Sequence, residues 1–149
     1  MNRYFRLAPL FILLFSCRND QSGEKEKAEN TAFTPYHWEA TDTGSLAMKK
    51  TEGVGPDTLS PQGVVSFLNH KWTHVQLEYM KTSGDTLFIT IPQPEYLTQR
   101  MGSSGSLAYL SEAVYNFTEI PGIHNVNFDF TEGDHAGPGT FNRDDFPRK

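Results

Sequence analysis

Residues 84–130 read GDTLFITIPQPEYLTQRMGSSGSLAYLSEAVYNFTEIPGIHNVNFDF, and this stretch decides the fold. Within it, residues 86–91 alternate apolar and polar positions, which is typical of a strand with one buried face. A Gly- and Ser-rich break follows at 101–105, and after it the apolar residues return at helical spacing. The stripe of this helix consists of Leu107, Leu110, Val114 and Phe117. The sequence therefore predicts a strand followed by a long amphipathic helix, with Ser104 or Ser106 as its cap.

The residues after this helix predict a return of the chain to the sheet. Pro121-Gly122 ends the helix, and residues 124–130 alternate again, with three apolar side chains facing inward: Val126, Phe128 and Phe130. Upstream, residues 74–80 and 86–91 flank the turn Ser83-Gly84-Asp85 and predict a hairpin. The fold class that follows is α/β (α+β), a two-layer domain in which one or two helices pack on a small, mostly antiparallel sheet.

Other segments give weaker signals. Ser60-Pro61 predicts the start of a shorter helix that ends at His70-Lys71. Residues 36–57 predict an irregular or hairpin-like lead-in, and residues 131–149 an ordered loop followed by a frayed end. On the long helix, three residues lie away from the centre of the apolar stripe: Tyr109, Glu112 and Asn116. Four aromatic residues could form a binding platform, although core or rim packing is the commoner role: Trp38, Trp72, Tyr96 and Tyr109.

The N-terminal residues predict export. Arg3 and Arg6 precede a short apolar run, and Ser16 precedes Cys17, the only cysteine of the chain. This order is typical of a secretory signal, and the run is too short for a membrane-spanning helix. The stretch resembles the lipobox of bacterial lipoproteins, which implies a signal peptide over 1–16 and lipidation of Cys17. A plain secretory signal is the alternative.

Composition sets further bounds. Residues 17–34 are polar and mix both charge signs, which predicts a flexible tether. The remaining residues, 35–149, suffice for a single domain. The net charge is −5, and removal of the signal peptide brings it to about −7, because two arginines leave with it. Without a basic patch the chain does not suit nucleic acid, so we expect no nucleic-acid partner.

One resemblance to a known family rests on residues 84–146. The motifs that carry it are the turn TEIPGI at 118–123 after the apolar helix, the strand VNF at 126–128, and the exit Glu132-Gly133. This part of the chain resembles the GerMN domain family of bacterial sporulation and germination lipoproteins and other envelope proteins. The resemblance implies an α/β domain that acts as a component of an envelope assembly.

From these features we expect a lipid-anchored protein of the bacterial cell envelope. The membrane holds it through its N-terminal lipid, and its partner is peptidoglycan or another envelope protein. Arg18 after the cysteine favours the outer membrane by resemblance to proteobacterial sorting, and the periplasmic or surface face stays open. We expect no enzymatic activity, no cofactor and no metal.

Two loops are the candidate contact sites for a ligand or partner. The first contains Gly102, Ser103, Ser104 and Gly105, and the second contains Asp134 and His135. The alternative hypothesis is a small hydrolase or metal-dependent enzyme that uses loops 101–106 and 132–139. An enzyme requires the two loops to converge in a concave pocket, whereas a scaffold does not.

Overall fold

The computed structural model describes residues 36–42 and 46–146. The predicted signal peptide, the lipidation site Cys17 and the tether lie outside the described residues. In chain order the elements are β1 (Tyr36–Asp42), β2 (Leu46–Glu52), α1 (Pro61–Lys71), β3 (Glu78–Ser83), β4 (Thr86–Thr90), the π-helical turn η1 (Tyr96–Arg100), α2 (Gly102–Phe117), β5 (Asn125–Asp129), β6 (Gly139–Phe141) and the 3-10 turn η2 (Arg143–Asp145).

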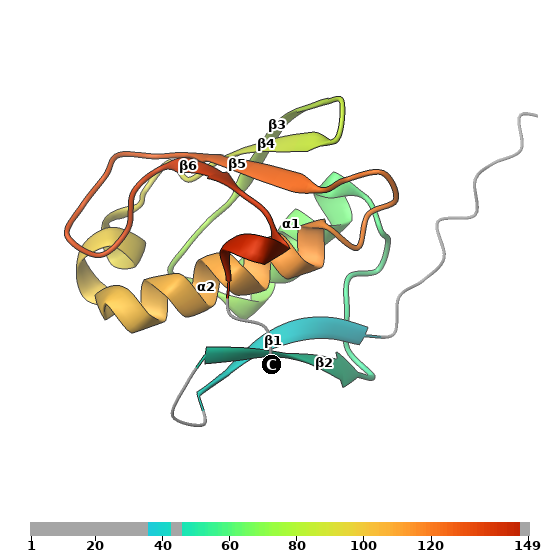
Figure 1. Ribbon diagram of the computed structural model, residues 1–149, viewed down its shortest axis with the longest axis horizontal. Helices are drawn as coiled ribbons and strands as arrows, with labels where there is room; N and C mark the ends of the chain where they lie inside the picture. Colours follow the sequence, from blue (N-terminus) through green and yellow to red (C-terminus); the bar gives the residue numbers. More distant parts are fainter. Residues whose placement is uncertain (1–35, 43–45, 147–149) are drawn as a thin grey trace, which may run out of the picture. The chain divides into compact units, whose positions relative to one another are not determined.

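A four-stranded sheet with the order β3-β4-β5-β6 forms one layer, and α1 and α2 lie on one of its faces (Figure 1). The β3–β4 and β5–β6 pairs are antiparallel. The β4–β5 pair is parallel, because η1 and α2 carry the chain back across the sheet between these two strands. The predicted fold class, a two-layer α+β domain with a mostly antiparallel sheet, is confirmed.

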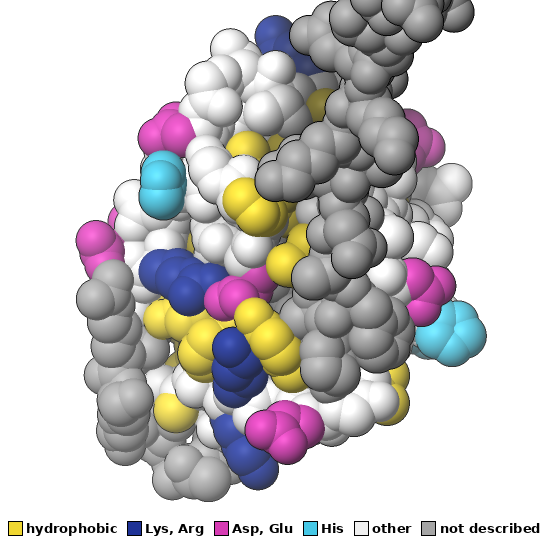
Figure 2. All heavy atoms as spheres, turned by 90° about the vertical axis from the view of Figure 1, so that its right-hand side faces the viewer, with side chains coloured by type: hydrophobic (Ala, Val, Ile, Leu, Met, Phe, Trp, Pro, Cys, Tyr) yellow, Lys and Arg dark blue, Asp and Glu magenta, His cyan; other side chains and the backbone are white. Residues whose placement is uncertain are grey.

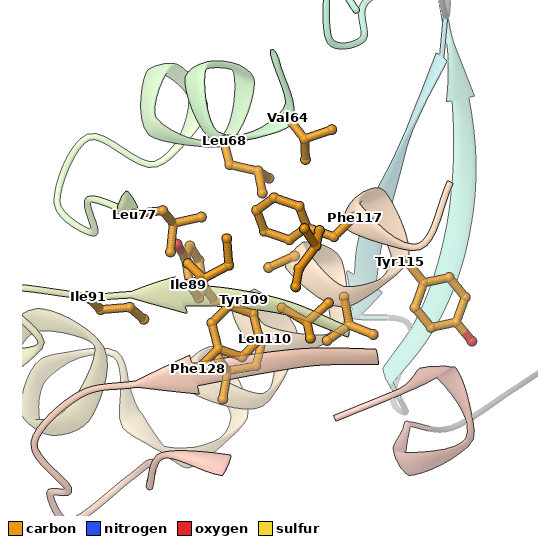
Figure 3. Packing of buried hydrophobic residues seen from close by; sticks show 14 of the residues in the cluster. Val64, Leu68, Leu77, Ile89, Ile91, Tyr109, Leu110, Tyr115, Phe117 and Phe128 are labelled. Atoms are coloured by element: carbon orange, nitrogen blue, oxygen red, sulfur yellow. The ribbon is translucent and has the colours of Figure 1, made fainter. Parts of the chain in front are cut away.

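The core lies between this sheet and the two helices. Leu87 and Ile89 of β4 pair with Val126 and Phe128 of β5, and all four side chains are at most 1% exposed. Figure 3 shows Ile89 and Phe128 facing Leu110 and Phe117 of α2. The period-two alternation seen in the sequence therefore marks the face of the sheet that the helices cover.

Helix α1 begins as predicted. The Ser60 side chain caps it by accepting a hydrogen bond from the Gly63 amide, at 3.1 Å, and Pro61 is its first residue. Glycine is needed at position 63 because Thr58 lies very close to its Cα, and not because the backbone there must be flexible. A Cβ at this position would lie 2.3 Å from Thr58 Oγ1 and 2.4 Å from the Thr58 carbonyl oxygen.

The predicted β3–β4 hairpin is present, but β3 begins later than residue 74. Asn69 on α1 explains the shift, because its side chain binds the backbone of Leu77 in both directions. Its Oδ1 accepts from the Leu77 amide at 2.8 Å, and its Nδ2 donates to the Leu77 carbonyl at 3.0 Å. Val75 and Leu77 are buried all the same. The alternation of apolar residues thus identified the buried side chains of Val75 and Leu77. It did not indicate that the Leu77 backbone binds the Asn69 side chain instead of a neighbouring strand.

The predicted cap of α2 is wrong, and its apolar stripe is confirmed only at Leu110, Val114 and Phe117, which are buried. The helix begins at Gly102 without a side-chain cap, and Ser106 is buried, with its hydroxyl donating to the Leu97 and Gly102 carbonyls. Leu107 is 42% exposed, although it was assigned to the stripe. Conversely, the three residues placed away from the stripe are buried: Tyr109, Glu112 and Asn116. The reason is that α2 packs on two sides, against the sheet and against β1.

The β1–β2 hairpin supplies the second side. Its strands pair antiparallel from Tyr36↔Glu52 to Asp42↔Leu46, so the hairpin-like alternative for this region is confirmed. Figure 3 shows Tyr115 of α2 pointing toward this hairpin, away from the other labelled core residues. The Tyr115 ring meets Trp38 of β1 edge to face, with centroids 5.1 Å apart.

Residues 131–138 form a loop, as expected, but the frayed end expected after it is wrong for residues 139–146. Residues 139–141 form β6, and Asn142 caps η2 in a capping box with Asp145. Phe146 is 4% exposed and packs in the core cluster. Burial of this one aromatic side chain near the C-terminus holds the tail, which composition alone does not indicate.

Gly63→Ala is expected to destabilise the domain, although alanine is the better helix former by about 1 kcal/mol. The Cβ would clash with the Thr58 carbonyl oxygen, a backbone atom that no rotamer change can move, so we expect a net loss of about 1–3 kcal/mol. Urea denaturation measures the effect. Ser66→Ala, at an exposed position of the same helix, is the control. A Gly63→Ala protein that is more stable than the wild type would contradict the close approach.

Candidate functional site

The two candidate loops meet in the folded protein. A hydrogen bond joins Ser103 Oγ and His135 Nδ1, which are 3.2 Å apart. The His135 amide also donates to the Thr98 carbonyl at 2.9 Å, so the second loop rests on η1. Gly133 permits this contact, because a Cβ there would lie 2.6 Å from Thr98 Cβ. The first turn of α2, which contains residues 102–105, and the loop after β5 therefore form one surface beyond the C-terminal ends of β4 and β5.

The predicted contact residues contribute unequally to this surface, which we name the Ser103–His135 surface and define by residues 102–105 and 133–135. Gly102 has a φ of +71°, a left-handed conformation that separates η1 from α2 and favours glycine. Ser103, Ser104 and Asp134 are exposed, whereas Gly105 is half-buried. Most of this surface is thus accessible to a partner.

A hydroxyl next to an imidazole is the beginning of a nucleophile–base pair, so the chemistry of this surface matters. In a catalytic triad, a carboxylate orients the imidazole through its second ring nitrogen. Within residues 36–42 and 46–146, no hydrogen bond or ion pair joins His135 to a carboxylate, and the neighbouring Asp134 does not supply one. The cavities over Phe88 and beside Arg143 are lined by other residues. The surface lacks the preorganisation that hydrolysis requires.

The alternative of a metal-dependent enzyme on loop 132–139 requires several ligating side chains to lie together. In the part of the chain that the structure describes, no three His, Cys, Asp or Glu side chains gather as a metal-binding group.

No helix among the described residues is long and apolar enough to cross a membrane.

The four aromatic residues do not form a platform, and packing, the commoner role, is confirmed, because they make three separate contacts. Trp72 meets Tyr109 edge to face, with centroids 5.6 Å apart, and Tyr109 is fully buried. Tyr96 stacks on His74, at 4.7 Å. Trp38 packs on Tyr115, as described above. These rings consolidate separate parts of the domain.

The sequence did not reveal a buried charge network that joins α1, α2 and β1. Glu112 on α2 is 2% exposed, and its Oε1 lies 2.7 Å from Lys71 Nζ and accepts from Trp72 Nε1 at 3.0 Å. Lys71 Nζ also lies 3.0 Å from Glu39 Oε1 on β1. His37 completes the network, with Nε2 at 2.9 Å from the same Glu39 oxygen and Nδ1 bonded to the Val54 carbonyl.

Two further polar residues, one on α2 and one just after it, extend the contact between α2 and β1. Asn116 acts like the edge of a neighbouring strand, because its Oδ1 accepts from the Trp38 amide and its Nδ2 donates to the Trp38 carbonyl, each at 3.0 Å. Glu119, just after α2, accepts from Trp38 Nε1 at 2.9 Å and from the Tyr36 hydroxyl. We name Glu112, Asn116 and Glu119 the polar stripe. Their spacing of i, i+4 and i+7 is the one signal by which the sequence could have disclosed it.

Arg143 secures the stripe from the C-terminal side. Its Nη2 lies 2.6 Å from Glu119 Oε1, and its guanidinium lies over the rings of Trp38 and Tyr115, at 5.3 and 4.9 Å. Burial raises the pKa of Glu119, but hydrogen bonds from Tyr36, Arg143 and Trp38 outweigh it, so the pKa lies below its ordinary value. Charged and hydrophobic side chains also adjoin one another on the face of the protein in Figure 2.

The network and the stripe are satisfied from within the domain, and they therefore hold the hairpin rather than perform chemistry. Two buried side-chain atoms make no hydrogen bond among the described residues: His37 Nε2, which lies 2.9 Å from Glu39 Oε1 as an ion-pair contact, and the Tyr109 hydroxyl. Burial, and then the negative charge of Glu112, raise the pKa of Tyr109 above the ordinary value. This phenol therefore stays neutral.

Comparisons with protein-family models, with curated proteins and with solved structures give no match.

The hairpin contact is expected to weaken in acid. The contacts with His37 and then Lys71 lower the pKa of Glu39 from 4.5 to about 2. A carboxyl group whose pKa falls on folding stabilises the protein above its unfolded pKa, and this contribution disappears as the pH falls from about 4.5 to about 2. Glu39→Gln should therefore lower stability at pH 7 and flatten its decline in this window.

Urea midpoints for the wild type and Glu39→Gln, compared across this pH range, measure the effect. Glu95→Gln changes an exposed glutamate outside the network and is the matched control. Parallel pH profiles for the wild type and Glu39→Gln would show that the charge of Glu39 does not support the hairpin.

Proposed function

We propose that this chain is a lipid-anchored cell-envelope protein whose GerMN-like domain is a binding or scaffolding module. One observation carries the binding role. The first turn of α2 and the loop after β5 converge, through Ser103 and His135, on an exposed surface that glycines shape and serines line. Its partner is peptidoglycan or another envelope protein. The acidic chain and the absence of a basic patch in the sequence disfavour nucleic acid.

The anchor is the second part of the proposal and rests on the sequence alone. Several acyl chains on Cys17 would hold the protein stably on a membrane, whereas one chain would do so only marginally. The outer membrane is favoured. The role that we assign to the domain requires no cofactor and no catalytic residue.

A small hydrolase is the second candidate, because the Ser103–His135 hydrogen bond places a hydroxyl next to a base. The two segments converge, as an enzyme on these loops would require. A hydrolase also needs a base that is held in one orientation, and His135 has no carboxylate partner among the described residues. The binding role is therefore the better supported.

Cys17→Ser tests the anchor. The variant should take up no labelled palmitate and should accumulate as the unprocessed precursor, because the thiol is the group that is lipidated. Metabolic labelling followed by membrane fractionation measures both effects. Ser16→Ala, which keeps a small residue before the cysteine, is the control. Undiminished labelling of Cys17→Ser would remove the basis for the lipoprotein assignment.

Photo-crosslinking tests the binding surface. A benzoylphenylalanine at Ser104 should capture an envelope component in cells, whereas the same residue at the equally exposed Ser66 on α1 should not. His135→Ala should fold normally and still complement a deletion strain, because a single contact at the rim of an interface contributes little. An enzyme would instead lose orders of magnitude in rate with its base. Loss of complementation by a folded His135→Ala protein, with capture at Ser104 retained, would favour the hydrolase.

A further inference from the structure

The face of the sheet that points away from the helices carries an ordered row of side chains. Strand register places Lys81 of β3 opposite Phe88 of β4, Phe88 opposite Asn127 of β5, and Asn127 opposite Thr140 of β6. On β4 and β5 the neighbouring positions, such as Leu87 and Val126, face the core. Figure 1 shows α1 and α2 on the other side of the sheet. The row thus crosses all four strands on the face opposite the helices.

A cavity of about 450 Å³ opens over this row. Its walls include Met80, Lys81, Phe88, Asn127, Asp129 and Pro138. A bulge between Tyr79 and Lys81 shifts the register of β3 and leaves Met80 in the extra position, 61% exposed. On the opposite side, Pro138 leads into the short strand β6. The cavity therefore has a half-buried aromatic ring as its apolar base and walls from two sides.

The polar groups around Phe88 combine donors and acceptors with no net charge. Lys81 provides an ammonium group, 4.8 Å from the centroid of the Phe88 ring, and Asp129 provides a carboxylate. Asn127 donates one N–H to Thr140 Oγ1, at 2.8 Å, which fixes the amide and leaves its Oδ1 as an acceptor. An ionic ligand would gain little here, because each of its charges would meet one like and one opposite charge.

The ligand that suits this lining has hydroxyl groups that both donate and accept, and one apolar face of C–H groups to lie on an aromatic ring. Saccharides have this combination. We propose that the cavity over Phe88 binds a neutral saccharide, with a sugar ring packed on Phe88 and its hydroxyl groups bonded to Asn127, Asp129 and Lys81. The site uses other residues than the Ser103–His135 surface, so neither proposal depends on the other.

The test is an NMR titration of the full-length chain in zwitterionic detergent micelles. The probes are tetrasaccharides of β-1,4-linked N-acetylglucosamine, β-1,4-linked glucose and α-1,4-linked glucose. At least one should shift the backbone amides of residues 80–81, 88 and 127–129 in a saturable way. Phe88→Ala should weaken that affinity at least about tenfold, the equivalent of one aromatic packing contact. Phe88→Leu, which keeps apolar bulk on the strand, should weaken it as well.

Thr86→Ala is the matched control, because Thr86 lies on the same strand and the same face, outside the cavity lining. It should leave the affinity within about twofold. The proposal is overturned if none of the three probes shifts these amides at about 10 mM, a concentration at which even very weak binding is visible. It is equally overturned if the folded Phe88→Leu protein binds as tightly as the wild type, or if the shifts map to residues 102–105 and 133–135.

Discussion

The arrangement of the domain depends on one buried carboxylate, Glu112. A charge with 2% exposure is tolerated only when other groups replace the water that it has lost. Here Lys71 and Trp72 at the end of α1 supply a cation and an N–H group, and the Ala40 amide of β1 lies 3.5 Å from the second oxygen. Removal of one partner of such a pair leaves the other charge buried and costs about 3–5 kcal/mol. Three elements are therefore held in one arrangement because a single side chain must be satisfied.

The parts of the fold that the sequence predicted are those set by local pattern. Alternation at 86–91 and 124–130 identified β4 and β5, and Ser60 identified the start of α1. Both signals are local, because the burial of one strand face and the capping of the first helical amides each involve only a few neighbouring residues. The parallel pairing of β4 with β5 depends instead on the path of the whole intervening segment. The faces of α2 were misjudged because a helix packed on two sides buries polar residues, which a search for one apolar stripe assigns to solvent.

The candidate site follows the same division. Glycine and serine at 102–105 indicated a turn at the start of a helix, and a left-handed Gly102 forms it. Nothing in the sequence indicated that His135, 32 residues further on, would meet Ser103. That contact depends on Gly133 packing against Thr98, which is a tertiary fit with no sequence period. The polar stripe was missed for a related reason, since its partners are backbone groups and rings of β1.

The position of β1 in the chain also has a mechanical consequence. β1 is the first described element, and in an anchored protein any load from the membrane enters the domain through its first residue, Tyr36. The stripe would bear that load in sequence: first the Glu119 contacts to Tyr36 and Trp38, then the two Asn116 bonds, then Glu112 at Ala40. If the proposed anchor holds the protein, these contacts would be loaded one after another, starting at the first residue of β1. The hairpin would then carry tension before the four-stranded sheet, whose strands pair only with one another.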